Sequence, residues 1–176
     1  MSGHNKFSKI KHLKAKNDAQ KSAQFGKLVR LIAVEAKKSG GDKSSPGLAT
    51  AIEKARKENM PNDTIDRAIK KATTDNSASM ETIVYEAYGP GGVAMLIDAL
   101  TDNRNKAAQE IKAILTRHEL ELASPGSASW AFHKVANEWQ PTSTMPLEDA
   151  DIEKLAAIVS DLEANDEVQN VYTNAE

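Results

Sequence analysis

The sequence has no cysteine, few aromatic residues and no long apolar run. Without cysteine there is no disulfide, no thiolate nucleophile and no cysteine-ligated zinc or iron–sulfur cluster. No stretch approaches the ~18–20 apolar residues of a membrane span, and no apolar signal segment follows the basic N-terminus. An aromatic share of 5% suits a helix-rich protein better than an aromatic-rich β-sandwich. We therefore expect a cytoplasmic protein that does not enter a membrane.

The motifs of common catalytic and cofactor sites are also missing. The four histidines, His4, His12, His118 and His133, do not have the HExxH spacing of a zinc site. There is no phosphate-binding loop, nucleophile elbow or dinucleotide-binding fingerprint. We therefore expect a protein that is not an enzyme, with no cofactor and no metal.

Charge is distributed very unevenly along the 176 residues, although the net charge is only −2. Residues 1–72 contain 17 Lys and Arg against 7 Asp and Glu, a net charge of +10. Residues 73–176 contain 6 against 18, a net charge of −12. This asymmetry predicts a basic module that binds a polyanion and a separate acidic module. The alternative is two solvated faces that complement each other.

The basic half predicts an N-terminal arm followed by three amphipathic helices. Residues 1–16 contain five lysines, two histidines and no acidic residue, which is typical of a basic arm. Apolar residues then recur at steps of three and four, predicting a helix that begins near Asp18. Ser45 is the expected cap of a second helix, and Asn62 or Asp63 that of a third. A three-helix bundle buries the three apolar faces, and its domain spans residues 1–72.

The acidic half predicts an α+β domain over residues 81–176, after a small polar linker at 73–80. Both β-rich runs and helical stripes occur, and their order favours a ferredoxin-like antiparallel arrangement. The expected elements are strands at Thr82–Tyr85 and Val93–Ile97, a helix capped by Asp102 or Asn103, a strand at Ser127–Phe132, a helix at Glu148–Ala164 and a strand at Val168–Thr173.

Spaced lysines with apolar residues between them have a direct use in nucleic-acid binding. Each lysine can neutralise one phosphate and release a counterion. Phe7 could stack on an exposed base or anchor the arm on the bundle, and the sequence leaves both open. Lys37 and Lys38 continue the charge along the first helix. The predicted nucleic-acid-binding residues are His4, Lys6, Phe7, Lys9, Lys11, His12, Lys14, Lys16, Lys21, Lys27, Arg30, Arg67, Lys70 and Lys71.

Two segments of the acidic half are candidates for contact with a partner. A glycine-rich turn at residues 89–92 could hold an anion through its N–H groups, but a turn between strands explains its composition more simply. A helix cap likewise explains the polar residues that begin at Asp102. The candidate contact residues are Tyr88, Gly89, Pro90, Gly91, Gly92, Asn103 and Arg104.

Several blocks of the sequence resemble the YebC family, which includes PmpR-type regulators and the mitochondrial translational activator of cytochrome c oxidase. The first block is Gly3–Phe7 with Ile10–His12, Lys14–Ala15 and Asp18–Ala19. The later blocks are Phe25–Arg30, Ala51–Arg56, Asn59–Pro61, Tyr85–Ala94, Asp102–Asn105 and Val168–Tyr172. Together they cover most of residues 3–132 and the C-terminal helix and strand.

The resemblance implies a helical N-terminal domain, following α+β domains and a non-enzymatic role in gene expression. Typical members carry a third domain before the last helix, where this chain has only Val135–Leu147. This chain is therefore expected to be a short form. We also expect Trp130 and Phe132 to pack against the helix around Ile152–Leu162, within one continuous domain.

Family members have been described as ribosome-associated factors that help translation through proline-rich stretches, and as DNA-binding transcriptional regulators. The first hypothesis is therefore a translation factor that contacts ribosomal RNA, and the second a regulator that binds duplex DNA. No helix-turn-helix signature is evident, and a lysine-rich arm suits irregular RNA at least as well as a major groove. A third hypothesis is an adaptor whose acidic domain docks a protein. The sequence does not indicate an oligomeric state.

Overall fold

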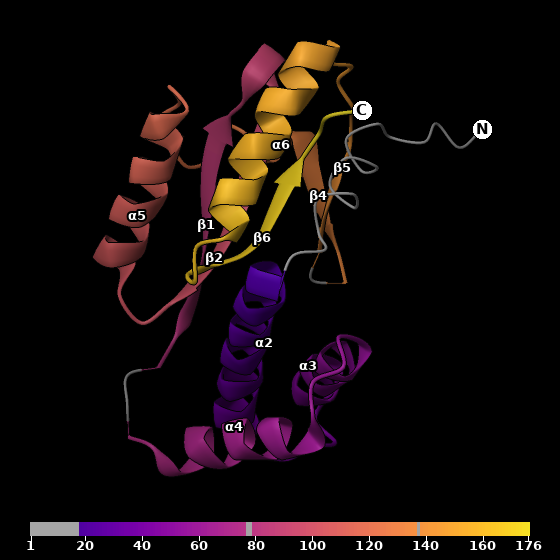
Figure 1. The fold of residues 1–176 in the computed structure, drawn as a ribbon, viewed down its shortest axis with the longest axis vertical. Helices are drawn as coiled ribbons and strands as arrows, with labels where there is room; N and C mark the ends of the chain where they lie inside the picture. Colours follow the sequence, from indigo (N-terminus) through magenta and orange to yellow (C-terminus); the bar gives the residue numbers. More distant parts are fainter. Residues whose placement is uncertain (1–17, 77–78, 137) are drawn as a thin grey trace, which may run out of the picture. The chain divides into compact units, whose positions relative to one another are not determined.

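The computed structural model describes residues 18–76, 79–136 and 138–176, which form two compact units (Figure 1). We call Asp18–Glu81 the helical unit and Thr82–Glu176 the sheet unit. The predicted basic arm lies outside the described residues.

The helical unit consists of α2 (Asp18–Ser39), α3 (Pro46–Lys57) and α4 (Asn62–Thr74). The long helix α2 packs against both shorter helices, as the predicted three-helix arrangement requires. Apart from Met60 between α3 and α4, their shared core is made of small and branched apolar side chains at helical spacing, which is the pattern that predicted the helices. Its buried members are Leu28, Ile32, Ala36, Leu48, Ala51, Ile52, Ala55, Met60, Ile65, Ala68 and Ile69.

One predicted helix cap is present and another is replaced. Ser45 stands at the N-cap of α3 with extended backbone angles, and Pro46 follows as the first helical residue. At α4 the cap position belongs to Pro61, so the prediction of Asn62 or Asp63 is wrong. The Pro61 carbonyl accepts the N–H groups of Thr64 and Ile65, which starts the helix one residue earlier than expected.

The sheet unit confirms the predicted α+β class. Its four-stranded sheet has the order β3-β1-β2-β6, with β1 antiparallel to β3 and β2 antiparallel to β6. A separate hairpin pairs β4 with β5. The strands are β1 (Glu81–Tyr88), β2 (Ala94–Thr101), β3 (Leu122–Ala123), β4 (Phe132–Val135), β5 (Glu138–Pro141) and β6 (Val168–Thr173), and the helices are α5 (Arg104–Arg117) and α6 (Asp149–Glu163).

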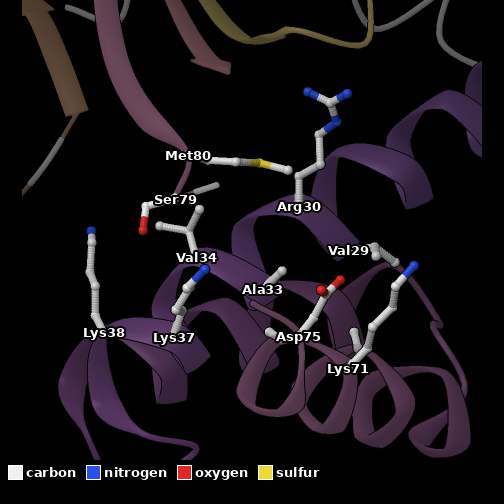
Figure 2. Close-up of a pocket in the computed structure, with 12 residues that line it drawn as sticks. Val29, Arg30, Ala33, Val34, Lys37, Lys38, Lys71, Asp75, Ser79 and Met80 are labelled. Atoms are coloured by element: carbon white, nitrogen blue, oxygen red, sulfur yellow. The ribbon is translucent and has the colours of Figure 1, made fainter. Parts of the chain in front are cut away.

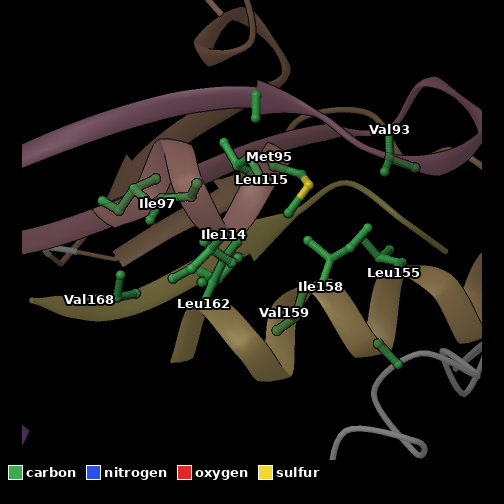
Figure 3. Close-up of a cluster of buried hydrophobic side chains, with 14 of the residues drawn as sticks. Val93, Met95, Ile97, Ile114, Leu115, Leu155, Ile158, Val159, Leu162 and Val168 are labelled. Atoms are coloured by element: carbon green, nitrogen blue, oxygen red, sulfur yellow. The ribbon is translucent and has the colours of Figure 1, made fainter. Parts of the chain in front are cut away.

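The main core of the sheet unit lies between the sheet and the two helices (Figure 3). Alternate residues of β2, namely Met95, Ile97 and Ala99, point into this core, as the two-residue period of a strand requires. The helices contribute apolar side chains at three- and four-residue spacing. These buried helical residues are Ile111, Ile114, Leu115, Leu155, Ala156, Ile158, Val159 and Leu162.

The opposite face of the sheet carries a second core that the sequence did not reveal. There Ala94 and Leu96 pack with Ala128, Ala131 and Phe132. None of the described members of this cluster comes from α6.

The expected packing of Trp130 and Phe132 against α6 is therefore wrong. Phe132 belongs to the second core, and the side chain of Trp130 is 64% exposed. The predicted strand Ser127–Phe132 is also wrong, because a 3₁₀ turn at Ser129–Ala131 comes before β4. The preceding loop takes its shape from hydrogen bonds to Glu86, which lies 40 residues or more away in the sequence.

Candidate nucleic-acid interface

The two units carry opposite net charge. Within Asp18–Glu81 there are 12 Lys and Arg against 9 Asp and Glu, a net charge of +3. Within Thr82–Glu176 there are 6 against 16, a net charge of −10. Residues 1–17 add five lysines and no acidic residue. The helical unit is thus the described part of the chain to which a polyanion is attracted.

The helices α2 and α4, with the segment that follows α4, line a pocket of about 460 Å³ (Figure 2). Four of its lining residues are cationic and one, Asp75, is acidic. The cations are Arg30, Lys37 and Lys38 from α2 and Lys71 from α4. The other lining residues are Val29, Ala33, Val34, Ala68, Ala72, Ser79 and Met80.

The sequence produces this pocket through spacing and side-chain size. Arg30 and Lys37 are seven residues apart, which places them on nearly the same face of α2. Ala33, Ala68 and Ala72 have short side chains, so α2 and α4 leave space between them where larger residues would fill it. An apolar hollow with a cationic rim results.

The pocket lining carries as much net charge as the whole helical unit. The pocket lining accounts for a charge of +3, which equals that of the whole helical unit, so the other 8 cationic and 8 acidic residues cancel. Some of those cancel in exposed ion pairs, such as Lys43 with Asp66 at 2.8 Å. Lys38 also pairs with Glu35 at 2.9 Å, although its side chain is 65% exposed.

The structure brings only part of the predicted binding set together. Arg30 and Lys71 both line the pocket, whereas the other predicted residues of the helical unit do not line it. Among these, Arg67 contacts the carbonyl of Asp63 and the hydroxyl of Thr64 on its own helix. Lys37 and Lys38 also line the pocket, whereas the sequence indicated them only as part of the charge on this helix. The feature of the sequence that indicates the pocket is the set of alanines on α2 and α4 that form the hollow. The predicted residues elsewhere are Lys21 and Lys27 on α2 and Lys70 on α4, while His4, Lys6, Phe7, Lys9, Lys11, His12, Lys14 and Lys16 lie outside the described residues.

The glycine-rich candidate at residues 89–92 forms the connection between β1 and β2. Gly91 and Gly92 have φ values of 69° and 81°, so both adopt the left-handed conformation that glycine tolerates. Gly89 is buried, and a β-carbon there would lie 2.9 Å from the sulfur of Met95. The turn predicted between the two strands is present, and in it Gly91 and Gly92 are exposed whereas Gly89 is not. A partner contact at this connection stays a prediction.

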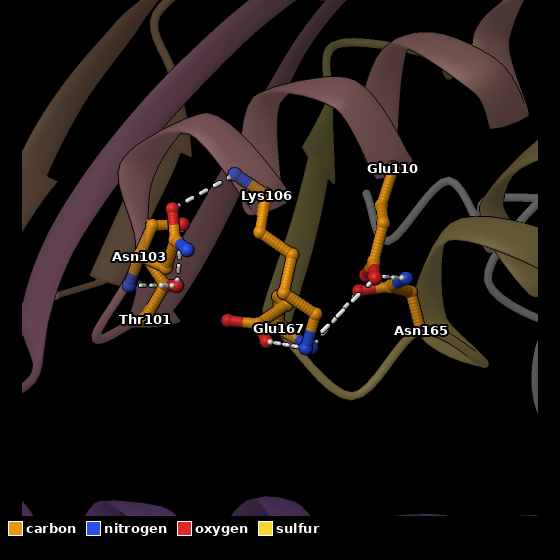
Figure 4. A network of polar contacts seen from close by, with 6 residues as sticks. All are labelled: Thr101, Asn103, Lys106, Glu110, Asn165 and Glu167. Atoms are coloured by element: carbon orange, nitrogen blue, oxygen red, sulfur yellow. Dashed lines mark hydrogen bonds and ion pairs between the residues drawn. The ribbon is translucent and has the colours of Figure 1, made fainter.

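Asn103 begins α5 as one of the two predicted caps. Its side-chain oxygen accepts a hydrogen bond from the backbone N–H of Lys106 at 3.1 Å, and its own N–H donates to the hydroxyl of Thr101 (Figure 4). The Lys106 ammonium lies 3.0 Å from the carboxylate of Glu167, whose side chain is 1% exposed. The cap accounts for Asn103, while contact of Asn103 or Arg104 with a partner stays a prediction.

Tyr88 ends β1 beside an exposed tryptophan. Its hydroxyl accepts the indole N–H of Trp130 at 3.1 Å and donates to the carbonyl of Ser127. Tyr88 is 38% exposed. Contact of this side chain with a partner is not tested by the structure.

Across residues 18–76, 79–136 and 138–176, no group of three or more His, Asp or Glu side chains could hold a metal ion. Within the same ranges, no helix is long and apolar enough to cross a membrane.

The fold and the pocket define a class of protein with a cationic helical unit joined to an acidic α+β unit. The chain belongs to the TACO1/YebC family. Residues 5–75 match the family model described as the TACO1/YebC protein N-terminal domain. Residues 80–137 and 133–175 match the model of the TACO1/YebC second and third domain. These two stretches overlap at residues 133–137, around the end of β4, where the short form was predicted to lack an insertion.

Similar proteins come from several bacteria. A protein named "Probable transcriptional regulatory protein" from Thermosipho africanus is 44% identical over 97% of this chain and 67% of its own length. A protein from Finegoldia magna with the same name is 43% identical over 100% of this chain and 74% of its own length. The crystal structure of the conserved hypothetical protein Aq1575 from Aquifex aeolicus superposes with a TM-score of 0.80 at 28% identity, covering 93% of each chain.

Proposed function

We propose that this chain is a non-enzymatic, cytoplasmic regulator of gene expression that binds nucleic acid through its N-terminal arm and helical domain. The observation that carries the proposal is the cationic rim of the pocket, whose lining has a net charge as large as that of the whole helical unit. Lysine and arginine side chains bind a polyanion by neutralising phosphates and releasing counterions. The sheet unit, with a net charge of −10, repels the same polyanion and is available for contact with a partner protein.

Ribosomal RNA is the proposed target, and assistance to translation elongation through difficult, proline-rich stretches is the proposed role. The resemblance to a family that includes a mitochondrial translational activator supports this role. The pocket supports an RNA target, because RNA recognition favours loops and ends with unstacked bases, which an apolar hollow can contact. The lysine-rich arm adds electrostatic binding that does not depend on the nucleotide sequence.

Regulation of transcription through duplex DNA is the second candidate function. The names of the relatives favour it, since those from Thermosipho africanus and Finegoldia magna are both called probable transcriptional regulatory proteins. A duplex would be bound through its phosphates by the same cationic side chains.

Sedimentation of a cell extract through a sucrose gradient tests the proposal. We expect the full chain to migrate with intact ribosomal subunits and to leave them after nuclease treatment. Lys71→Glu should weaken the association. Lys57→Glu reverses an equally charged, exposed lysine outside the pocket, so it should have little effect. Recovery of the wild-type chain only in the free fraction at low salt, together with tight binding to one DNA duplex, would replace the translation role with the transcriptional one.

A further inference from the structure

We propose that the pocket between α2 and α4 receives one unpaired nucleotide of a bound RNA strand, with the base in the apolar hollow and the flanking phosphates on the cationic rim. The inference rests on the proposed function, because it assumes that the helical unit meets a nucleic acid. It adds a site within that surface, and it predicts a preference for single strands.

The size and lining of the pocket suit a base. A volume of about 460 Å³ lies within the range of ~300–1,000 Å³ that is typical of small-molecule sites. Val29, Ala33, Val34 and Ala72 present apolar surface from two helices, and Met80 contributes a flexible, polarisable side chain. A base has flat apolar faces, so it can occupy this hollow while the phosphates of the strand stay in water.

The placement of charge suits a polymer better than a free nucleotide. In Figure 2, Lys38 and Lys71 stand on opposite sides of Ala33, and Lys37 lies between them. A nucleotide within a strand has a phosphate on each side of its sugar, whereas a free monophosphate has only one. Cations from two different helices can therefore contact both neighbouring phosphates of a strand.

An acidic protein segment would meet the same charges, and the charge of the N-terminal sequence favours RNA over it. The five lysines of residues 1–17 extend the positive charge along the sequence, which suits a long polyanion of regular charge. Asp75 at the pocket opposes any anion, so a ligand must gain more from the four cations than it loses to this carboxylate. Two adjacent phosphates of a strand offer these cations two negative charges at a fixed separation.

A duplex does not supply the proposed ligand, because its bases are paired and stacked. Extruding one base costs a few kcal/mol in general, and the cost is smallest where the strand is already single. The pocket is thus expected to raise the affinity for single-stranded RNA while leaving the affinity for a perfect duplex unchanged.

Filling the hollow without altering its charge tests the inference in the full chain. Ala33→Leu and Ala72→Leu each place a larger side chain in the pocket, from α2 and from α4 respectively. Ala49→Leu makes the same change at an exposed position of α3 outside the pocket. Circular dichroism and thermal unfolding select the filled variants that keep the wild-type fold.

Binding is measured with a 12-nucleotide single-stranded RNA and with a duplex of the same sequence at several salt concentrations. We expect each filled variant to bind the single strand about five- to tenfold more weakly, the loss expected for one base contact. The dependence of log K on log salt should stay at the wild-type slope, because no phosphate contact is removed. Ala49→Leu and the duplex affinity should change less than about twofold.

Three further kinds of ligand test which molecule occupies the pocket. In a series of RNAs, each strand has one abasic position, placed at a different nucleotide in each. The wild-type chain should bind at least one of these strands more weakly than the intact RNA, and Ala33→Leu should show no such loss. Adenosine monophosphate alone should bind far more weakly than the strand. Tight binding of this compound would show that the pocket is a site for a free nucleotide and would overturn the inference. Poly-glutamate that competes as well as RNA would assign the site to an acidic protein segment.

The outcome also separates this inference from the proposed function. Salt-dependent RNA binding that both filled variants retain in full would overturn the pocket while leaving the function in place. Absence of RNA and DNA binding by the wild-type chain would overturn both. Equal weakening of single-strand and duplex binding by Ala33→Leu would show that the pocket region binds phosphates without receiving a base, which also overturns the inference.

Discussion

The carboxylate of Glu86 in β1 accepts a hydrogen bond from the backbone N–H of Ala128 at 2.6 Å, across 42 residues of sequence. The same carboxylate accepts the N–H groups of Gly126 at 2.6 Å and Ser129 at 2.9 Å. Glu86 is only 7% exposed. Burial by itself raises the pKa of Glu86, but the three N–H donors favour the charged form, and the net effect is a lowered pKa. A single buried side chain thus fixes the loop before β4.

Replacing Glu86 is expected to destabilise the sheet unit. Glu86→Ala leaves three backbone donors without their acceptor and should cost about 2–4 kcal/mol of unfolding free energy. Glu86→Gln should cost less, since its amide keeps one oxygen but turns an N–H group toward the loop. Denaturant unfolding at pH 7 measures both.

The pH dependence gives this prediction a second test. Because the folded pKa of Glu86 is lowered, its stabilising effect is present above the unfolded pKa of ~4.3 and is lost as the pH falls through the folded value. The difference between wild type and Glu86→Gln should therefore shrink below about pH 4. A constant difference from pH 7 to pH 3 would contradict the assignment of the charged carboxylate to this loop.

Sequence patterns predicted the elements that depend on local periodicity. The apolar stripe of α6 matches its buried face, the β-rich run at Val93–Ile97 corresponds to β2, and Ser45 followed by Pro46 stands at the start of α3. These signals lie within a few residues of one another, so no long-range contact is needed to detect them.

The errors fall where a distant partner decides the local structure. Ser127–Phe132 has the composition of a strand, but its loop bends around Glu86 and Phe132 packs on the face of the sheet away from the helices. The sequence did not predict the pocket, for a related reason. Ala33 on α2 and Ala72 on α4 are small residues that read as ordinary helix formers until the two helices lie together.

A side chain at position 91 is expected to destabilise the sheet unit. Its φ of 69° costs an L-residue roughly 1–2 kcal/mol, and a β-carbon would lie 2.5 Å from a methyl carbon of Leu147. Gly91→Ala should therefore lower the unfolding free energy by about 1–3 kcal/mol, and Gly91→Val by more.

Gly26→Ala is the matched control for this change. Gly26 lies within α2, and none of the described atoms outside its own helix stretch lies within 4 Å of a β-carbon there. Alanine at this position should raise the unfolding free energy by about 0.4–1 kcal/mol. Equal effects of the two substitutions in thermal unfolding would argue against a conformational role for Gly91.

Asp98 should show the opposite pH dependence to Glu86. Burial raises the pKa of the Asp98 carboxyl, while Trp139 and the charge of Lys134 only partly counteract it. The indole nitrogen of Trp139 favours the charged form without reaching hydrogen-bond geometry to Asp98 Oδ1. Burial, together with the charges of Asp98 and Glu138, also raises the pKa of Tyr172 to about 12.

Asp98→Asn is therefore expected to stabilise the protein at neutral pH by up to ~1 kcal/mol. A raised folded pKa means that the contribution of Asp98 is most favourable below its unfolded pKa of ~3.9 and is lost as the pH rises through the folded value. The advantage of Asp98→Asn should thus disappear as the pH falls toward 4. Urea unfolding at both pH values measures it, with the exposed Asp102→Asn as control. A gain that is the same at pH 7 and pH 4 would exclude titration of Asp98 as its cause.

Removing lysines from the N-terminal arm should change the salt dependence of nucleic-acid binding. Alanine at Lys6, Lys9, Lys11 and Lys14 removes up to four phosphate contacts. The slope of log K against log salt should flatten by roughly 0.7 per lost contact on a single strand and about 0.9 on a duplex. Titration of the full chain with ribosomal RNA fragments and with duplex DNA at several salt concentrations measures both slopes.

A second quadruple variant separates phosphate contact from net charge. Alanine at Lys43, Lys57, Lys112 and Lys154 removes the same charge from exposed positions outside the pocket. Three of these lysines form exposed ion pairs, whose loss costs little stability. If the arm contacts phosphates directly, only the first variant flattens the slope, because the slope counts neutralised phosphates and long-range attraction is screened within about 10 Å at 0.1 M salt. Equal slopes for the two variants would remove the arm from the binding surface and leave the helical unit as its remaining cationic part.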